Sequence, residues 1–324
     1  MLLQSLLLLL GLVLLLAGGE SLVRGASALA RRLGLSEVLI GLTVVAFGTS
    51  APELVVCLSA ALGGSAAIAF GNAVGSNVAN LGLLLGATAL LSPLRVQSSL
   101  ITREIPFLVA ASVALLALGA DAVFGIGADA LTRGDGIVLL VFFGIFLFAN
   151  ARDVLVSRGD SMVKEAVELT VATVRPAVTG AVVMVLLGLV GLVIGGQLAV
   201  SAASDIARAL GVGEVVIAAT VVAVGTSLPE LVTCLLAARR GAHDLAVGNI
   251  VGSNLFNVLF VLASTAVVSP VPLPPGGWID LLISLVLALI LLPMAATQGR
   301  RITRGEGLIF LAAYGGYLVF QLVR

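Results

Sequence analysis

Ten apolar segments, each about 20 residues long, recur along this chain and leave little room for a soluble fold. They lie near residues 2–22, 38–62, 67–91, 104–120, 134–150, 178–198, 213–238, 243–268, 277–296 and 306–322. Hydrophobic residues make up 60% of the 324 residues and charged residues only 10%. So few charges cannot cover a soluble surface, whereas a bundle that faces lipid needs few. The chain is predicted to be an all-α polytopic membrane protein with ten transmembrane helices in the cell (inner) membrane.

The chain contains a long internal repeat. Residues 18–80 align without a gap to residues 195–257, at a constant offset of 177, and 36 of these 63 positions are identical. The first predicted helix therefore has a counterpart in the sixth, which argues against reading the N-terminal apolar run as a cleaved signal peptide.

The repeat divides the chain into two halves of five helices each. Residues 1–150 form the first half, residues 151–177 a charged cytoplasmic linker, and residues 178–324 the second half. Because five is an odd number, the second half enters the membrane in the opposite orientation. The repeats are therefore predicted to be inverted, as in many secondary transporters. The motif-bearing helices are expected near 38–62, 67–91, 213–238 and 243–268.

Basic side chains are distributed unevenly between the two sides of the predicted bundle. Helix parity places 14 of the 17 Lys and Arg residues on one side and only Arg133, Arg208 and Arg324 on the other. The positive-inside rule assigns the side with 14 charges to the cytoplasm, so both termini are predicted to be extracytoplasmic. Seventeen acidic residues balance the basic ones, which leaves no basic excess for nucleic acid.

Each half carries the motif Gly-Thr-Ser-x-Pro-Glu, which ends at Glu53 in the first half and at Glu230 in the second. The proline of each motif lacks an N–H and its ring crowds the carbonyl four residues back, so the helix is predicted to break there. The motif hydroxyls precede the glutamate by three and four residues and therefore share its helix face. These hydroxyls belong to Thr49, Ser50, Thr226 and Ser227.

A second motif, Gly-Asn-x-x-Gly-Ser-Asn-x-x-Asn, follows in each half at residues 71–80 and 248–257. Its polar residues recur every four positions, so their oxygens are expected to line one stripe of a helix. They are Asn72, Ser76, Asn80, Asn249, Ser253 and Asn257. The motif glycines are expected to allow close helix packing.

The two glutamates indicate a cation site inside the membrane. A carboxylate near the bilayer centre costs at least a few kcal/mol unless it is compensated, and neither motif helix offers a Lys or Arg nearby. Oxygen ligands without His or Cys clusters favour Na⁺ or Ca²⁺ over zinc, copper or iron. Two carboxylates balance one divalent ion, and the same groups suit monovalent ions, which is the physical basis of an antiporter. No nucleotide-binding loop, metalloprotease motif or nucleophile triad indicates an enzyme or a cofactor.

With these motifs, duplicated within hydrophobic helices, the chain resembles the cation/calcium antiporter superfamily in its branch of prokaryotic sodium/calcium exchangers. The resemblance implies exchange of Ca²⁺ for Na⁺ by alternating access, with Glu53 and Glu230 shared by both ions. It implies further contributions from Thr49, Ser50, Ser76, Thr226, Ser227 and Ser253, with Asn80 and Asn257 flanking the centre. Ala46 and Ala223 would contribute main-chain carbonyls. The first and sixth helices would slide across the core formed by the four motif helices.

Asn257 bears on whether potassium is transported as well. Relatives that also carry potassium place Asp at this position, so the resemblance implies no dependence on potassium.

A Ca²⁺/H⁺ or other cation/H⁺ antiporter that uses the same glutamates is the nearest alternative, and a cation channel or a membrane enzyme is a more distant one. Both halves of the site lie in one chain, so a monomer is expected to suffice.

Overall fold

The computed structural model describes residues 2–121, 129–159, 177–211 and 225–323, with the backbone alone for residues 153–159 and 322–323. Within these ranges the chain is mostly helical. Seven helices are long and apolar enough to cross a membrane, and an eighth is added if the bent pair Glu37–Thr49 and Ala51–Leu62 is one span. The prediction of a helical membrane protein is confirmed. The count of ten stays a prediction. The seventh expected segment is described only from residue 225 onward, and the helix Arg304–Val323, which covers the tenth, is not among these spans.

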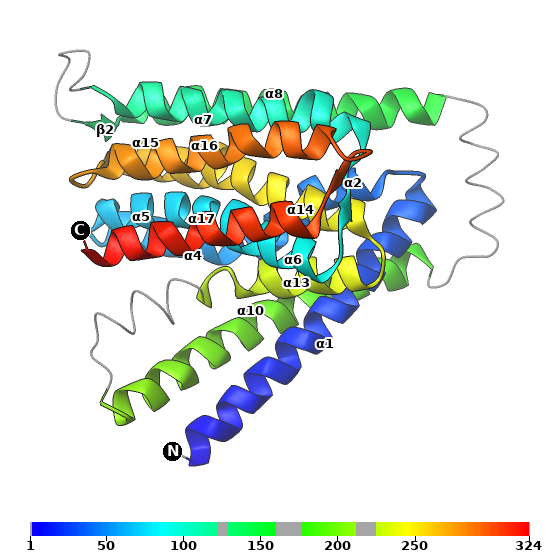
Figure 1. Cartoon of the computed structure of the whole chain (residues 1–324), viewed down its shortest axis with the longest axis horizontal. Helices are drawn as coiled ribbons and strands as arrows, with labels where there is room; N and C mark the ends of the chain where they lie inside the picture. Colours follow the sequence, from blue (N-terminus) through cyan, green and yellow to red (C-terminus); the bar gives the residue numbers. More distant parts are fainter. Residues whose placement is uncertain (1, 122–128, 160–176, 212–224, 324) are drawn as a thin grey trace.

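The described part of the chain up to Gly159 contains thirteen helical elements and strands, and α10 opens the described part of the second half (Figure 1). The elements of the first half are α1 (Leu2–Leu33), α2 (Glu37–Ile40), the π-helical turn η1 (Gly41–Val45), α3 (Ala46–Thr49), α4 (Ala51–Leu62), α5 (Ala66–Ala79), the π-helical turn η2 (Asn80–Leu84), α6 (Leu85–Leu91), β1 (Leu94–Arg95), the π-helical turn η3 (Leu100–Glu104), α7 (Ile105–Gly119), β2 (Ala130–Leu131) and α8 (Arg133–Gly159).

The described elements of the second half repeat this order in part. They are α10 (Val178–Ala209), α13 (Leu228–Arg239), α14 (His243–Phe256), the π-helical turn η5 (Asn257–Leu262), α15 (Ala263–Val268), β3 (Val271–Pro272), α16 (Gly277–Ala296), β4 (Arg301–Ile302) and α17 (Arg304–Val323). Two short antiparallel strand pairs join the halves: β1 pairs with β4, and β2 pairs with β3.

Several helices are longer than the sequence predicts. The first expected helix, 2–22, continues to Leu33, and the sixth, 178–198, continues to Ala209. Hydropathy ends each predicted span at its first polar residues, but the helix itself ends only where Gly34 and Gly211 adopt positive φ angles of 65° and 82°. Likewise, α8 extends to Gly159 and makes the first nine residues of the predicted linker helical.

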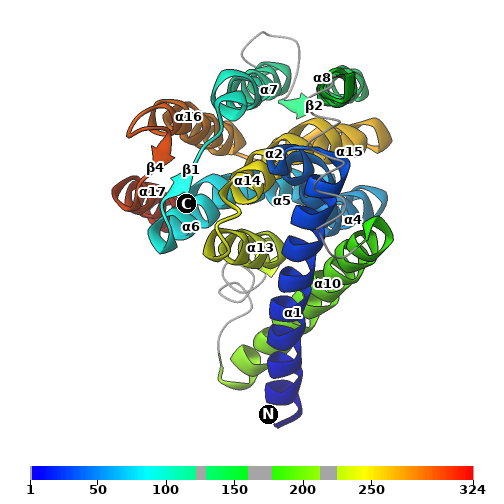
Figure 2. The same cartoon turned by 90° about the vertical axis from the view of Figure 1, so that its right-hand side faces the viewer.

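Helices α1 and α10 form an antiparallel pair that lies at an angle to the other helices (Figures 1 and 2). A Cβ atom at Gly18 would lie 2.8 Å from the main-chain nitrogen of Leu192, and one at Gly188 would lie 2.6 Å from that of Leu22. The two backbones therefore touch, which only glycine permits. Glycines recur every seven residues along this contact, at Gly11, Gly18, Gly25, Gly188 and Gly195.

The remaining helices form a bundle with α5 and α14 near its middle (Figure 2). Every residue of α14 from Leu245 to Phe256 is buried. Gly248 and Gly252 of α14 pack on the backbone of the first motif helix: a Cβ atom at Gly252 would lie 2.7 Å from the Cα atom of Leu42. This close packing brings the two motifs of opposite halves together.

Candidate cation site

The first motif helix breaks where Pro52 predicts. Helix α3 ends at Thr49, Ser50 has φ −88° and ψ 6°, and α4 begins at Ala51 with a bend of 44°. In the second half Ser227 has φ −88° and ψ 7°, and α13 begins directly after it with Pro229 in its first turn. The same residues thus start a new helix in the same way in both halves, because proline suits the first turn of a helix and not its interior.

Glu53 and Glu230 lie in the first turns of these new helices, where the positive end of the helix dipole favours a carboxylate. Their side chains are only 1% and 2% exposed, and Ser50, three residues before Glu53, donates a hydrogen bond to Glu230 Oε1 at 3.0 Å. The Oε2 atom of each has no hydrogen-bond partner among the described residues. The fold therefore places two carboxylates together in its interior, each with an oxygen available to a ligand.

Hydroxyl groups of the first half contact polar groups of the second. Ser50 donates its Oγ hydrogen to Glu230 Oε1 at 3.0 Å, and Thr49 donates to Asn249 Oδ1 at 3.3 Å. Thr49 and Ser50 are both completely buried. These bonds hold the two motifs in register, and the site cannot form from one half alone.

Asn80 and Asn257 each begin a π-helical turn, η2 and η5 respectively. Both side chains are 1% exposed, and the Oδ1 atom of each has no partner in the described part of the chain. A π turn shifts the helical register by one residue and is frequent at functional sites. Here it occurs at the equivalent motif position of both halves.

The other expected ligands divide into three groups. Ser76, Ser227 and Ser253 are buried, and the hydroxyls of the last two have no partner among the described residues. Ala46 is buried and its carbonyl accepts from the Ser50 N–H at 3.0 Å. Thr226 is half-buried at the edge of a cavity, and Ala223 lies outside the described residues.

Two features of the site escaped the sequence analysis. Asn77 contacts the second half through both ends of its amide, and the only signal for it in the sequence is its place as a fixed asparagine of the second motif. The two cysteines also contact the second motifs: Asn72 donates to Cys57 Sγ at 3.4 Å and Asn249 donates to Cys234 Sγ at 3.3 Å. These thiols therefore orient the first asparagine of each second motif.

A cavity of about 510 Å³ lies between α4 and α10 and reaches the broken helices at Pro52, Thr226 and Pro229. The equivalent space between α13 and α1 is filled by side chains of α13. A Cβ atom at Gly19 of α1 would lie 2.9 Å from Val232 and 2.8 Å from Leu236, whereas one at Gly196 of α10 would have no neighbour closer than 3.7 Å. The two halves thus differ in access to the motifs.

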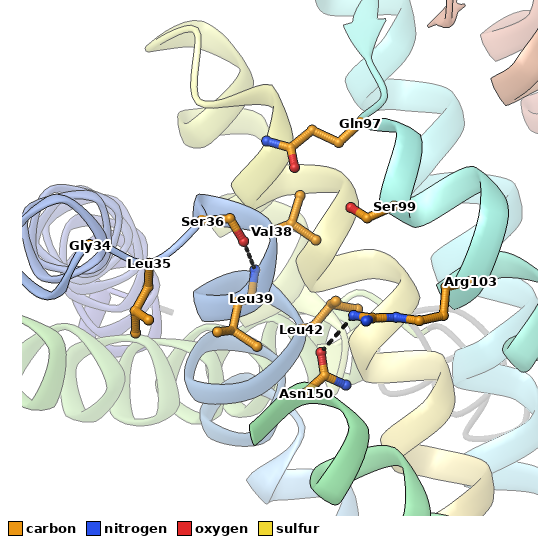
Figure 3. A pocket seen from close by; sticks show the side chains of 10 residues that line it. All are labelled: Gly34, Leu35, Ser36, Val38, Leu39, Leu42, Gln97, Ser99, Arg103 and Asn150. Atoms are coloured by element: carbon orange, nitrogen blue, oxygen red, sulfur yellow. Dashed lines mark hydrogen bonds between the residues drawn. The ribbon is translucent and has the colours of Figure 1, made fainter. Parts of the chain in front are cut away.

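A separate cavity of about 270 Å³ lies among α2, η3 and the end of α8 (Figure 3). Two of its polar lining side chains bind each other, since Arg103 donates to Asn150 at 3.5 Å, and Arg103 also donates to the neighbouring Glu104 at 2.7 Å. None of its lining residues belongs to the motifs. This cavity is therefore distinct from the paired glutamates.

The chemistry of the paired glutamates is that of a site for hard cations. Carboxylate, hydroxyl and amide oxygens are the ligands that Na⁺ and Ca²⁺ prefer. Among the described residues, no group of three or more His, Cys, Asp or Glu side chains is arranged to hold a metal ion.

The sequence profile of the family described as "Sodium/calcium exchanger protein" matches residues 3–151 and 180–323. The chain belongs to this family of membrane transport proteins. It is 31% identical to the sodium/calcium exchanger MaX1 of Methanosarcina acetivorans, over 97% of both chains. It is 34% identical to the inner membrane protein YrbG of Escherichia coli (strain K12), over 99% of this chain and 96% of that one.

Solved structures show the same fold. The sodium-calcium exchanger NCX_Mj soaked with 10 mM Na⁺ and zero Ca²⁺ superposes with a TM-score of 0.80 at 30% identity, over 98% of both chains. A second structure of NCX_Mj, soaked with 2.5 mM Na⁺ and 0.1 mM Ca²⁺, gives a TM-score of 0.80 at 31% identity. The resemblance to an exchanger family is confirmed.

Proposed function

We propose that this protein exchanges Ca²⁺ for Na⁺ across the membrane by alternating access, with both ions using one site between the two halves. The observation that carries the proposal is the burial of Glu53 and Glu230 in two helix starts that the Ser50–Glu230 hydrogen bond joins. Among the described residues, no Lys, Arg or His forms an ion pair with either carboxylate. Two buried, unpaired carboxylates are costly and call for a compensating cation, and together they match the charge of one Ca²⁺.

The ligand set that we propose combines the two motif pairs. The carboxylates of Glu53 and Glu230 would be joined by hydroxyl and amide oxygens and by two main-chain carbonyls, in numbers sufficient for the six to eight oxygens that Ca²⁺ takes. The contributing residues would be Ala46, Thr49, Ser50, Ser76, Asn80, Ala223, Thr226, Ser227, Ser253 and Asn257. The unpartnered oxygens of Ser227, Ser253, Asn80 and Asn257 support this assignment.

We also propose the architecture of ten helices in two inverted repeats, 1–150 and 178–324, separated by a linker at 151–177. The antiparallel contact of α1 with α10 supports inversion: Gly11 lies beside Gly195, and Gly25 lies beside Ala181. The distribution of basic residues supports an orientation with both termini outside the cytoplasm. Because each chain supplies both glutamates, a monomer is sufficient for transport.

The unequal access of the two halves supports alternating access. The cavity beside Pro52 extends along α10 to Ser204, toward the end of that helix that the charge distribution assigns to the extracytoplasmic side. The contact of α1 with α13 closes the equivalent route on the other side. Movement of the α1–α10 pair across the bundle would exchange the open and closed routes.

The proposal is tested by ⁴⁵Ca²⁺ uptake into proteoliposomes loaded with Na⁺ and diluted into buffer without Na⁺. Uptake should require internal Na⁺ and should vanish in Glu53→Gln and in Glu230→Gln. Glu37→Gln is the control, because this half-buried carboxylate lies outside both motifs and faces Arg31 at 3.7 Å. Uptake that ignores Na⁺ but follows a pH gradient would instead establish the Ca²⁺/H⁺ antiporter, in which the same glutamates accept protons.

A further inference from the structure

Asn77 of α5 makes two hydrogen bonds, and both cross to the second half of the chain. Its Nδ2 atom donates to the main-chain carbonyl of Asn254 at 3.3 Å, and its Oδ1 atom accepts from Asn257 Nδ2 at 3.1 Å. The side chain is 2% exposed. Asn77 is therefore a buried bridge between the backbone of α14 and a side chain of the proposed site.

The polarity of this bridge fixes the orientation of Asn257. A main-chain carbonyl only accepts hydrogen bonds, so the NH₂ end of the Asn77 amide must face Asn254. The oxygen of Asn77 must then face Asn257, which in turn must present its own NH₂ group. The consequence is that the Oδ1 atom of Asn257 points away from Asn77, and it has no partner among the described residues.

We propose that Asn77 is a positioning residue, which holds the Asn257 amide with its oxygen toward the transported cation. This inference rests on the proposed function, in which Asn257 is a ligand. Without Asn77 the amide of Asn257 is free to turn by 180°, because its two ends have nearly the same shape. The turned amide would present N–H hydrogens, the positive end of its dipole, to a cation.

The bridge occurs in one half of the described structure. Asn254 is the repeat equivalent of Asn77, but its Nδ2 atom donates to the carbonyl of Ile250 within its own helix, at 2.7 Å. Its Oδ1 atom has no hydrogen-bond partner among the described residues, so this side chain does not set the orientation of Asn80, the equivalent of Asn257. Asn254→Ala removes an amide of the same kind and keeps the main-chain carbonyl that holds Asn77, which makes it the matched control.

The test measures the effect of Asn77→Ala on cation affinity in two backgrounds, the unsubstituted protein and Asn257→Asp. Affinity is read on purified protein from the stabilisation against heat by Ca²⁺ and by Na⁺, because a ligand that binds only the folded state raises the melting temperature. Asn77→Leu, which keeps the number and branching of the side-chain heavy atoms and leaves no cavity, is measured in parallel so that a cavity alone is not mistaken for the effect.

In the unsubstituted background, Asn77→Ala and Asn77→Leu should weaken Ca²⁺ binding by about tenfold, as expected for one misoriented ligand dipole. Asn254→Ala should weaken it by less than about threefold. In the Asn257→Asp background both carboxylate oxygens accept, so no orientation is needed, and the Asn77 oxygen would face another oxygen. The same Asn77 substitutions should then cost nothing or improve binding.

An equal loss of affinity in both backgrounds would mean that Asn77 acts on folding or packing only, and would overturn the inference while leaving the proposed function intact. A loss for Asn254→Ala as large as that for Asn77→Ala would overturn it too. If the unsubstituted protein is stabilised by neither Ca²⁺ nor Na⁺, the proposed function itself fails, and the inference fails with it.

Discussion

Ser50 donates a 3.0 Å hydrogen bond to Glu230, although 180 residues separate them in the chain. The serine is the single residue between α3 and α4, and the glutamate lies in the first turn of α13. One half of the repeat thus orients the carboxylate of the other half. This bond makes the site a property of the whole chain and leads to the first prediction.

Ser50→Ala should weaken Ca²⁺ binding by about 10- to 100-fold, because a hydrogen bond to a charged group contributes about 1.5–3 kcal/mol. Equilibrium binding of ⁴⁵Ca²⁺ to purified protein measures this. Ser59→Ala is the control, since Ser59 is exposed on the same helix, α4. Equal affinities for the two variants would show that the Ser50 hydroxyl does not contribute to the site.

The glycine contacts between α1 and α10 predict a loss of stability on substitution. Gly188→Ala should lower the free energy of unfolding by about 1–3 kcal/mol, because its Cβ atom would lie 2.6 Å from the Leu22 nitrogen and 2.8 Å from the Gly18 carbonyl oxygen. Neither backbone atom can move without separating the helices. The measurement is the fraction of monodisperse protein that survives a temperature series in detergent.

Gly144→Ala provides the comparison for that experiment, because a Cβ atom at Gly144 of α8 meets nothing within 4 Å. Alanine is also the better helix former, so this variant should be as stable as the unsubstituted protein or slightly more so. Equal losses at Gly188 and Gly144 would contradict the close contact between α1 and α10.

The open space between α4 and α10 and the filled space between α13 and α1 predict unequal access to two equivalent positions. Val55 of α4 lines the cavity beside α10 and is 63% exposed, whereas its repeat equivalent Val232 packs against α1 at Gly19. A membrane-impermeant thiol reagent should therefore modify Val55→Cys and not Val232→Cys in the absence of Ca²⁺. The unsubstituted protein is the blank, since Cys57 and Cys234 are both buried. Faster labelling of Val232→Cys would show that the space between α13 and α1, and not that between α4 and α10, is the open one.

The amide at Asn257 predicts transport that is independent of potassium. With a neutral side chain there, the site carries two carboxylates, which one Ca²⁺ already balances, and no further charge remains for K⁺. Replacing K⁺ by choline on either side of the proteoliposome membrane should change ⁴⁵Ca²⁺ uptake by less than about twofold, or ~0.4 kcal/mol. A strict requirement for K⁺ would show that other oxygens recruit it.

Much of the fold and of the candidate site is readable from local sequence because the physics behind it is local. A proline breaks the helix that contains it, so the start of a new helix at Ala51 follows from Pro52 alone. Long apolar runs predict spans because the bilayer has a fixed thickness. The ends of α1 and α10 were less predictable, since hydropathy marks the membrane boundary whereas Gly34 and Gly211 end the helices.

The chain by itself determined the membrane class, the duplicated motifs and the two buried glutamates, because spacing along a helix decides which residues share a face. Tertiary structure alone decided the partners across the repeat. Nothing near Asn77 in sequence indicates that it bonds Asn257, 180 residues away, or that Asn254 at the equivalent position bonds its own helix instead. Which polar atoms pair and which stay free for a cation depends on how the two halves pack, and that packing sums contacts from the whole chain.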